Sequence, residues 1–300
     1  MELPWPHTRC IVCLRDDVTM TRAHLVPESL GGFVWARTHC ASCNNSLGTR
    51  VEAGVKKDPT IRYALEHALA DELPELVKSF AQGLPYVIPS EQGPLAARYH
   101  DGAVELGTTK LDGSLVQERD RAAQTIETML ERAGADAEER QAALDRIAAA
   151  EVGELVDIGH GLAIRHGTTE GASITFDGQL VSDEFPLAIA FHLLAFFVGD
   201  LIYGDALEPI RATLRGDSPL DEAHVAVESL IDRSTGYVPE HVLGLSRVEP
   251  HLVIRVQLFG PGLWHVHLLR VKAPKLEAMG MMLNVKERAV YPAAPAPVTQ

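Results

Sequence analysis

The sequence has no cysteine after residue 43 and no excess of basic residues. All four cysteines of the 300-residue chain lie in its first 43 positions, which argues against a disulfide framework spread over the chain. Lysine and arginine together number 27, against 41 aspartates and glutamates, for a formal net charge of −14. An acidic protein repels nucleic acid on average, so the overall charge argues against a nucleic-acid partner.

The acidic residues are unevenly distributed along the chain. Residues 1–58 hold seven basic and six acidic side chains, net +1, whereas residues 59–300 hold 20 and 35. Nearly all the excess acid therefore lies outside the first segment, where contact with phosphates stays compatible with the sequence. Taken singly, its basic residues favour an interpretation as ordinary surface charge over phosphate contact: Arg9, Arg15, Arg22, Arg37, Arg50, Lys56 and Lys57.

Signals for export and membrane insertion are also lacking. The N-terminal segment has no basic stretch followed by an apolar run, so no signal peptide is expected. The longest apolar run, residues 187–198, is interrupted by His192. It is too short to cross a bilayer and predicts a buried helix. We therefore expect a cytoplasmic protein with no membrane partner, a setting that keeps thiols reduced.

The cysteines form two closely spaced pairs, Cys10-x-x-Cys13 and Cys40-x-x-Cys43. Four thiolates complete the tetrahedral coordination of Zn²⁺ and leave no position open for substrate. The spacing therefore predicts a structural zinc ion that holds the fold and performs no chemistry. Two disulfides, or unrelated thiols, are the alternatives.

The residues between and after the pairs narrow the choice of family. His24-Leu25-Val26-Pro27 is followed by Gly31-Gly32, and residues 40–48 read Cys-Ala-Ser-Cys-Asn-Asn-Ser-Leu-Gly. In order and spacing this resembles the HNH endonuclease family, in the ββα-metal, treble-clef-like branch with two CxxC zinc knuckles. The resemblance covers roughly residues 7–58. Independently, residues 44–57 can form a helix whose first N–H groups are free to meet a phosphate.

The resemblance implies a role for each residue of the motif. His24 would be the general base that activates water against a phosphodiester, as a neutral imidazole can. Asn44 would ligate a catalytic Mg²⁺ or Mn²⁺ ion, with Asn45 as the adjacent alternative. A structural histidine and a pair of helix-capping asparagines are the competing interpretations. His39 is expected to be a solvated loop residue, because four cysteines already fill the zinc site.

Position 23 departs from the family pattern. The family usually has an acidic cation ligand immediately before the base histidine, and here that position is Ala23. A single neutral amide is a poor anchor for Mg²⁺, which favours carboxylates. Three alternatives stay open. The alanine is an engineered, inactivating replacement, or the domain is naturally weak or inactive, or another carboxylate serves, with these nearby in sequence: Asp16, Asp17, Glu28 and Glu52.

The rest of the chain predicts an α+β fold in which a larger mixed domain follows the zinc module. We expect domains at 1–58 and 59–291, with a disordered Pro/Ala-rich tail at 292–300. Helices are predicted over 59–82 with a break at Pro74, over 118–133, over 136–152 and over 185–203. Hairpins are predicted at 95–106 and 252–271, and a β pair within 162–174. The helices at 118–152 have no obvious partner within their domain. His265-Val266-His267 favours a surface or partly buried pair over a metal site.

Together these features predict a metal-dependent HNH-type endonuclease acting on double-stranded DNA. Residues 59–291 would sense, target or dimerise. A role in restriction or anti-phage defence rests on analogy with similar nucleases. Cutting both strands needs two sites, so a homodimer or higher oligomer is expected. The alternative is a catalytically inactive, zinc-stabilised DNA-binding or regulatory protein, and RNA cleavage is a weaker third.

Overall fold

The chain divides into two compact units in the computed structural model. Residues 1–82 and 176–300 form the first unit, and residues 83–175 form the second. The predicted domain boundaries at residues 58 and 291 do not coincide with these divisions. The structure describes residues 1–80, 86–88, 95–100, 103–106, 109–111, 114–117, 119–151, 153–160, 162–166, 181–231, 236–248, 251–269 and 278–293.

The first unit starts with the predicted ββα arrangement. Strand β1 (Met20–His24) pairs antiparallel with β2 (Trp35–Cys40), and helix α1 (Ala41–Arg50) follows directly. The register shifts between Thr21 and Ala23, which indicates a bulge just before His24. Bulges of this kind re-aim the next side chains. A short 3₁₀ turn, η1 (Glu28–Leu30), ends at Gly31 with φ +80°, a conformation that glycine adopts without strain.

A series of short helices continues from α1 and confirms the predicted helical region. The elements are η2 (Glu52–Lys57), α2 (Pro59–Tyr63), the π-helical η3 (Ala64–Ala68) and α3 (Pro74–Phe80). Asp58 caps α2 by accepting a hydrogen bond from the Ile61 amide, with proline at the first helical position. The break before Pro74 lies where the sequence predicts it.

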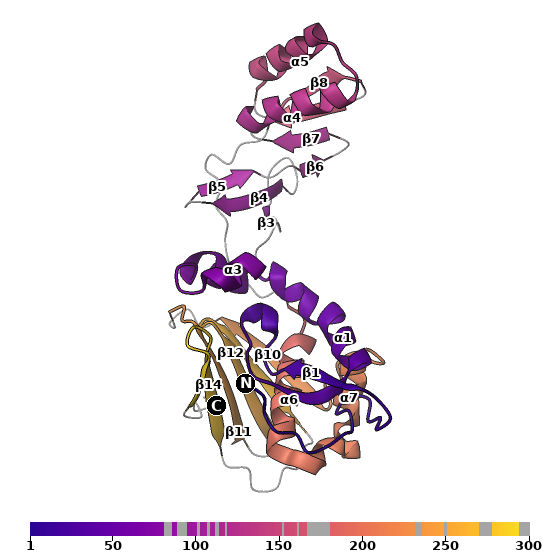
Figure 1. Cartoon of the computed structure of the whole chain (residues 1–300), viewed down its shortest axis with the longest axis vertical. Helices are drawn as coiled ribbons and strands as arrows, with labels where there is room; N and C mark the ends of the chain where they lie inside the picture. The colour runs from indigo at the N-terminus through magenta and orange to yellow at the C-terminus, as the bar shows by residue number, and fades with distance from the viewer. Residues whose placement is uncertain are drawn as a thin grey trace. The chain divides into compact units, whose positions relative to one another are not determined.

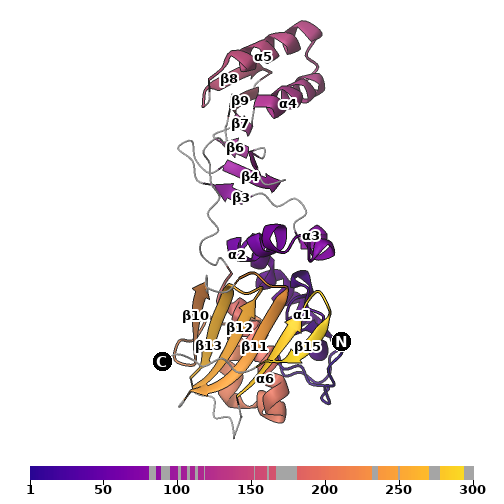
Figure 2. The ribbon, with the colours of Figure 1, turned by 90° about the vertical axis from the view of Figure 1, so that its left-hand side faces the viewer.

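A six-stranded antiparallel sheet forms the second half of the first unit (Figure 2). Its strand order is β10-β13-β12-β11-β14-β15, and the hairpin of β12 and β13 is the one predicted around residues 260–262. Pro292 pairs with Met281, so the predicted disordered tail does not begin at residue 292; residues 294–300 lie outside the described part. The strands are β10 (Val225–Ile231), β11 (Glu240–Val248), β12 (His251–Leu258), β13 (Gly262–Leu268), β14 (Met279–Asn284) and β15 (Ala289–Pro292).

Helix α6 (Glu184–Val198) packs against β12 and β13 (Figures 1 and 2). It confirms the predicted buried helix and continues through η4 (Gly199–Tyr203) and η5 (Asp205–Leu207) to α7 (Glu208–Arg215). By length and composition alone, Glu184–Tyr203 could cross a membrane, yet 61% of its most apolar window is buried inside the protein. A core helix of this kind needs no bilayer to cover it.

Residues 1–58 share one hydrophobic core with described residues between Val181 and Val285. The core joins Val12 and Leu25 to Phe185 and Leu187. Polar contacts cross the same boundary: Arg50 pairs with Glu184 and donates to the carbonyls of Thr213 and Leu214, and Arg215 donates to the carbonyl of Val12. A ββα module of this size buries too little apolar surface by itself, which explains why the larger sheet and its helices cover it.

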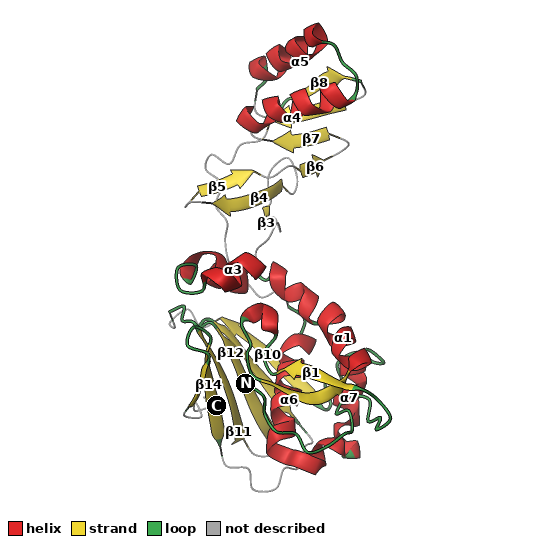
Figure 3. Ribbon diagram, viewed as in Figure 1, coloured by secondary structure: helices red, strands yellow, loops and turns green. Residues whose placement is uncertain are grey.

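The second unit contains two small sheets and a helical hairpin (Figure 3). Helices α4 (Arg119–Arg132) and α5 (Ala137–Ala149) were predicted, and their apolar faces form the core of this unit with β8 and β9. They therefore have an intradomain role, contrary to the expectation. The strands are β3 (Tyr86–Ile88), β4 (Leu95–His100), β5 (Ala103–Leu106), β6 (Thr109–Leu111), β7 (Ser114–Gln117), β8 (Leu155–Gly159) and β9 (Leu162–His166).

Two of the predicted β pairings fall in this unit. The hairpin of β4 and β5 is confirmed, although its turn residues lie outside the described part. The pair expected within 162–174 is different: β9 pairs with the preceding β8 and, in parallel, with β7. Residues 167–180, which include the second half of the segment predicted to form a β pair, lie outside the described residues.

His241 is fully buried in the first unit and links the sheet to the N-terminal module. Its Nε2 donates to the carbonyl of Leu30 at 2.9 Å. Burial lowers the pKa of His241 from 6.5 to about 4. Between these two pH values the unfolded chain binds a proton at this position and the folded chain does not. Stability is therefore unaffected above about pH 6.5 and falls as the pH drops toward 4.

Replacing this histidine should flatten the pH dependence of stability. Each pKa unit corresponds to about 1.4 kcal/mol, so this one residue accounts for a loss on the order of 3 kcal/mol between pH 7.5 and 4. In His241→Gln, whose amide can still donate to Leu30, the fall in unfolding free energy over this range should be smaller by up to that amount. Urea unfolding at several pH values measures it. Equal pH dependence in both proteins would contradict the assignment.

Candidate functional site

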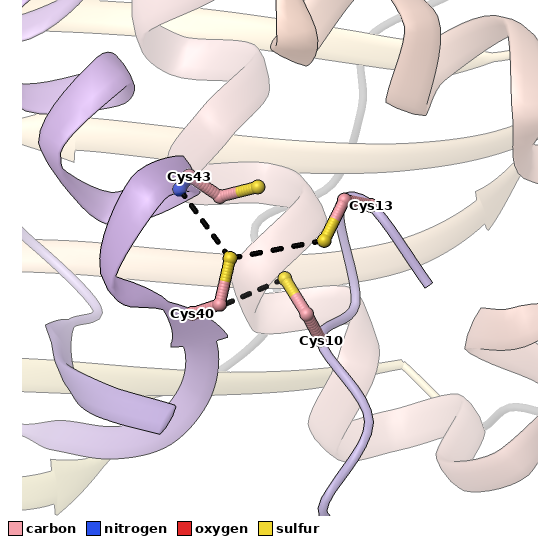
Figure 4. Close-up of side chains that lie close together, drawn as sticks. All are labelled: Cys10, Cys13, Cys40 and Cys43. Atoms are coloured by element: carbon pink, nitrogen blue, oxygen red, sulfur yellow. Dashed lines mark hydrogen bonds between the residues drawn. The ribbon is translucent and has the colours of Figure 1, made fainter. Parts of the chain in front are cut away.

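The four cysteines meet at one point of the N-terminal module. Cys10 and Cys13 come from the loop before β1, whereas Cys40 and Cys43 lie at the start of α1 (Figure 4). Their Sγ atoms all lie within 4.8 Å of one another, and those of Cys13 and Cys40 are 3.7 Å apart. Tetrahedral zinc with bonds of about 2.3 Å to sulfur separates its ligands by roughly 3.8 Å. The cluster therefore has the donor set and spacing to bind zinc.

Backbone groups support thiolates at this position. The amide of Cys40 donates to the Cys10 sulfur at 3.3 Å, and the amide of Cys43 donates to the Cys40 sulfur at 3.5 Å (Figure 4). A hydrogen bond with the side chain of Cys43 lowers the pKa of the Cys10 thiol to about 4, whereas burial raises the pKa of Cys13. The N-terminus of α1 adds positive electrostatic potential. These cysteines are free thiols, which disagrees with the two-disulfide alternative.

His24 ends strand β1, directly after the bulge. It lies opposite Trp35 in the register and is half-buried. Burial lowers the pKa of His24, and the negative charge of Glu28 partly opposes this shift. The imidazole is consequently neutral at pH 7 and can accept a proton, as a general base must.

A small cavity of about 30 Å³ lies beside His24. A water molecule needs about 10–15 Å³, so there is room for one. Of the candidate residues, Ala23, His24 and Asn44 line this cavity. Asn45 does not: it is exposed, and its backbone carbonyl accepts a hydrogen bond from the hydroxyl of Thr49. The geometry thus favours Asn44 over Asn45 as the asparagine of the site.

Asn44 joins the helix to the bulged strand. Its side-chain Nδ2 donates to the carbonyl of Arg22 at 3.1 Å. This bond uses the nitrogen and leaves Oδ1 as an acceptor for a ligand. Because Cys43 directly precedes Asn44 at the start of α1, the cysteine cluster and this amide lie on the same turn of the helix.

The cavity also brings in a carboxylate, that of Glu52 on η2. Burial raises the pKa of Glu52. The other acids considered from the sequence are absent from its lining. Glu28 lies 3.8 Å from Arg22, Asp16 lies 3.9 Å from Arg9, and Asp17 pairs with Arg15 at 3.3 Å.

A buried histidine from α6 contacts the site from behind. His192 Nδ1 lies 3.2 Å from the carbonyl oxygen of His24, and its Nε2 lies 2.8 Å from Oγ1 of Thr38. A carbonyl only accepts, so Nδ1 carries the proton and Nε2 accepts from the threonine hydroxyl. Burial lowers the pKa of His192 to about 4, so the ring is neutral.

His39 continues this chain of hydrogen bonds. Its Nδ1 lies 2.8 Å from Oγ1 of Thr38 and donates to it, because that hydroxyl proton is already committed to His192. His39 is only 4% exposed and lines the cavity. The expectation of a solvated loop residue is therefore wrong, because position 39 faces α6 on strand β2. Sequence reasoning missed His192 as well, whose sole signal was a polar residue interrupting an apolar run.

Most basic side chains of residues 1–58 already have partners. Arg50 is tied to Glu184 and to two carbonyls at the end of α7, and Arg9 donates to the carbonyl of Leu14. Arg22 pairs with Glu28 at 3.8 Å and Arg37 with Glu2 at 3.7 Å, and each arginine also lies over the ring of Trp35 with half or more of its side chain exposed. They are the basic residues of this module best placed to reach a phosphate.

A second group of potential ligands lies on the large sheet. Glu228, His265 and His267 have side-chain atoms within 4.8 Å of one another. However, burial lowers the pKa of His265, and the charge of Arg255, which lies opposite it in the register, lowers it further. The same charge opposes a cation, in line with the predicted surface or partly buried pair.

Comparison with known families gives a match over the N-terminal module. Residues 10–60 match the model of the HNH endonuclease family. The match confirms the resemblance seen in the sequence, and it includes the four cysteines, His24 and Asn44. Searches of curated proteins and of solved structures found no match. The HNH domain implies a nucleic-acid substrate in general, and the family match extends no further than residue 60.

We expect about one zinc ion per chain in the purified protein. Cys13→Ser should lower the zinc content to near zero and lower the thermal unfolding temperature, because the binding energy of a structural metal contributes to folding. Ser42→Ala, between the second pair of ligands, should leave both unchanged. Elemental analysis and calorimetry measure the two effects. Protein that folds normally without any metal would contradict the zinc assignment.

Proposed function

We propose that the protein is a metal-dependent nuclease of the HNH type that hydrolyses phosphodiester bonds in double-stranded DNA. The observation that carries this proposal is the neutral imidazole of His24 on a cavity shared with Asn44, within the family match. His24 would take the proton of the attacking water. A bound Mg²⁺ or Mn²⁺ would supply stabilisation of the developing phosphorane charge. The cysteine-bound zinc would hold the two strands and the helix in place.

Other residues of the module would orient the base and the substrate. The hydrogen bond from His192 to the backbone of His24 fixes the end of strand β1, and Asn44 fixes the bulge before it. Arg22 and Arg37, stacked on Trp35, would contact phosphates beside the site. Such contacts position a backbone without reading its sequence, so they fit DNA and RNA alike.

A second candidate function is a zinc-stabilised DNA-binding or regulatory protein without cleavage activity. Ala23 favours it, because an alanine cannot supply the acidic ligand usual at this position. A cytoplasmic location is likewise a proposal, and a role in restriction or anti-phage defence rests on analogy.

Substituting the proposed base should abolish cleavage. His24→Ala is expected to reduce Mg²⁺- or Mn²⁺-dependent nicking of supercoiled plasmid by roughly 10²–10⁴-fold, the usual contribution of general-base catalysis. DNA affinity, measured by fluorescence anisotropy, should change little. His7→Gln, in the same module but outside the cavity, is the matched control. Unchanged nicking by His24→Ala would contradict the assignment, and DNA binding without cleavage by the unmodified chain would favour the second function.

A homodimer or higher oligomer is the proposed assembly. One site attacks one strand, so a double-strand break is most simply made by two sites related by a two-fold axis. Light scattering on the full chain, with and without DNA, should give at least twice the monomer mass. A monomer mass at micromolar concentration under both conditions would leave single-strand nicking as the expected activity.

A further inference from the structure

The structure contains a carboxylate that can take the place of the one missing at position 23. We propose that Glu52 and Asn44 together bind the divalent cation beside His24, an inference that rests on the proposed nuclease function. The acidic ligand would thus come from the segment after the helix instead of from strand β1. This would allow a chain with Ala23 to bind the metal.

Placement within one cavity is the first support. Ala23 and Glu52 both line it, although Ala23 lies on the first strand of the ββα module and Glu52 follows its helix. Ala23 is 3% exposed, so a side chain at this position faces the interior and not solvent. A carboxylate on β1 and a carboxylate on η2 would therefore enter the same space, next to the same histidine.

The surroundings of Glu52 are the second support. Its side chain is largely sheltered from solvent, and no hydrogen-bond donor or cationic side chain pairs with it in the described part of the chain. A sheltered carboxylate without a partner is costly, and a bound cation removes that cost. The remaining acids near the motif already face arginines at the surface, and none of them lines the cavity.

The ligand atoms identify the class of cation. Glu52 offers carboxylate oxygens, and Asn44 offers Oδ1 while its Nδ2 is held by the carbonyl of Arg22. Hard oxygen donors of this type, completed by water, suit Mg²⁺ and Mn²⁺. Zinc, by contrast, would prefer the four thiolates nearby. The two metal positions are therefore chemically distinct within one small module.

Mn²⁺ binding to the zinc-loaded full-length protein tests this inference directly. Electron paramagnetic resonance reports free Mn²⁺, so affinity is read without any cleavage. Glu52→Gln keeps the shape of the side chain and removes its charge, and it should weaken Mn²⁺ binding by roughly 10–100-fold. Glu28→Gln is the matched control and should bind as the unmodified chain does. If Glu52→Gln leaves the melting temperature unchanged, weaker Mn²⁺ binding reflects the loss of a ligand and not the loss of the fold.

Returning a carboxylate to position 23 provides a second, independent arm. Ala23→Asp in the Glu52→Gln background should restore Mn²⁺ affinity, because it places a carboxylate in the same cavity. With Glu52 intact, Ala23→Asp should tighten binding, since affinity rises with the number of charged ligands. Both responses are expected if the cavity is the cation site, and failure of both would overturn the inference.

The two proposals fail in different ways. Equal Mn²⁺ affinity in Glu52→Gln and the unmodified chain, or no Mn²⁺ binding by either, overturns the role of Glu52. Cleavage that then persists in Glu52→Gln leaves the nuclease proposal intact. Conversely, Mn²⁺ binding that depends on Glu52, with no cleavage of DNA or RNA by the unmodified chain, supports the cation site and removes the nuclease function.

Discussion

The candidate site depends on the four-thiolate cluster that joins the N-terminal loop to the start of α1. Cys40 is the N-cap of this helix and Cys43 lies in its first turn, so any ligand they share sets the helix position against strand β1. Asn44, the next residue, then meets the carbonyl of Arg22. Without that anchor, a strand and a helix as short as β1 and α1 would not hold the Asn44 amide beside the His24 imidazole.

A second constraint comes from outside the family match. His192 on α6 is 168 positions from His24 in the chain, yet it donates to the His24 carbonyl and accepts from Thr38 on β2. Both strands of the module are therefore tied to one buried ring. Because burial keeps this ring neutral, its single N–H proton stays on Nδ1. His192 therefore donates to the His24 carbonyl and accepts from Thr38 at pH 7. Thr38 and His39 extend the same ordered chain of donors and acceptors.

Local patterns explain how much the sequence could predict. The cysteine spacing, the proline after β1 and the helix after the second cysteine pair are set by neighbouring residues, and the structure has them. Helix α6 and the hairpin of β12 and β13 follow from apolar runs and a glycine-rich turn in the same way.

His192 and His39 could not be assigned, because their burial depends on a strand meeting a helix far along the chain. The choice of Glu52 among four acids likewise depends on which segments meet around the cavity in the folded protein. The unit boundaries were missed for the same reason, since a shared core leaves no local signal.

The residues that line the cavity show that the larger part of the first unit contributes to the candidate site. They come from β1 and β2, from α1 with η2, and from α6, segments that meet only when the two parts of the first unit, residues 1–82 and 176–300, are folded together. If the rest of the chain were a separate regulatory domain, residues 1–58 would form the whole cavity by themselves. Here Phe185, Ala188 and His192 close the cavity from the α6 side. Sheltering His24 and Glu52 from water depends on that helix, and so do the pKa shifts that burial causes. The large sheet supports α6 in turn, so it acts as a structural component of the candidate site, whatever further partner the protein has.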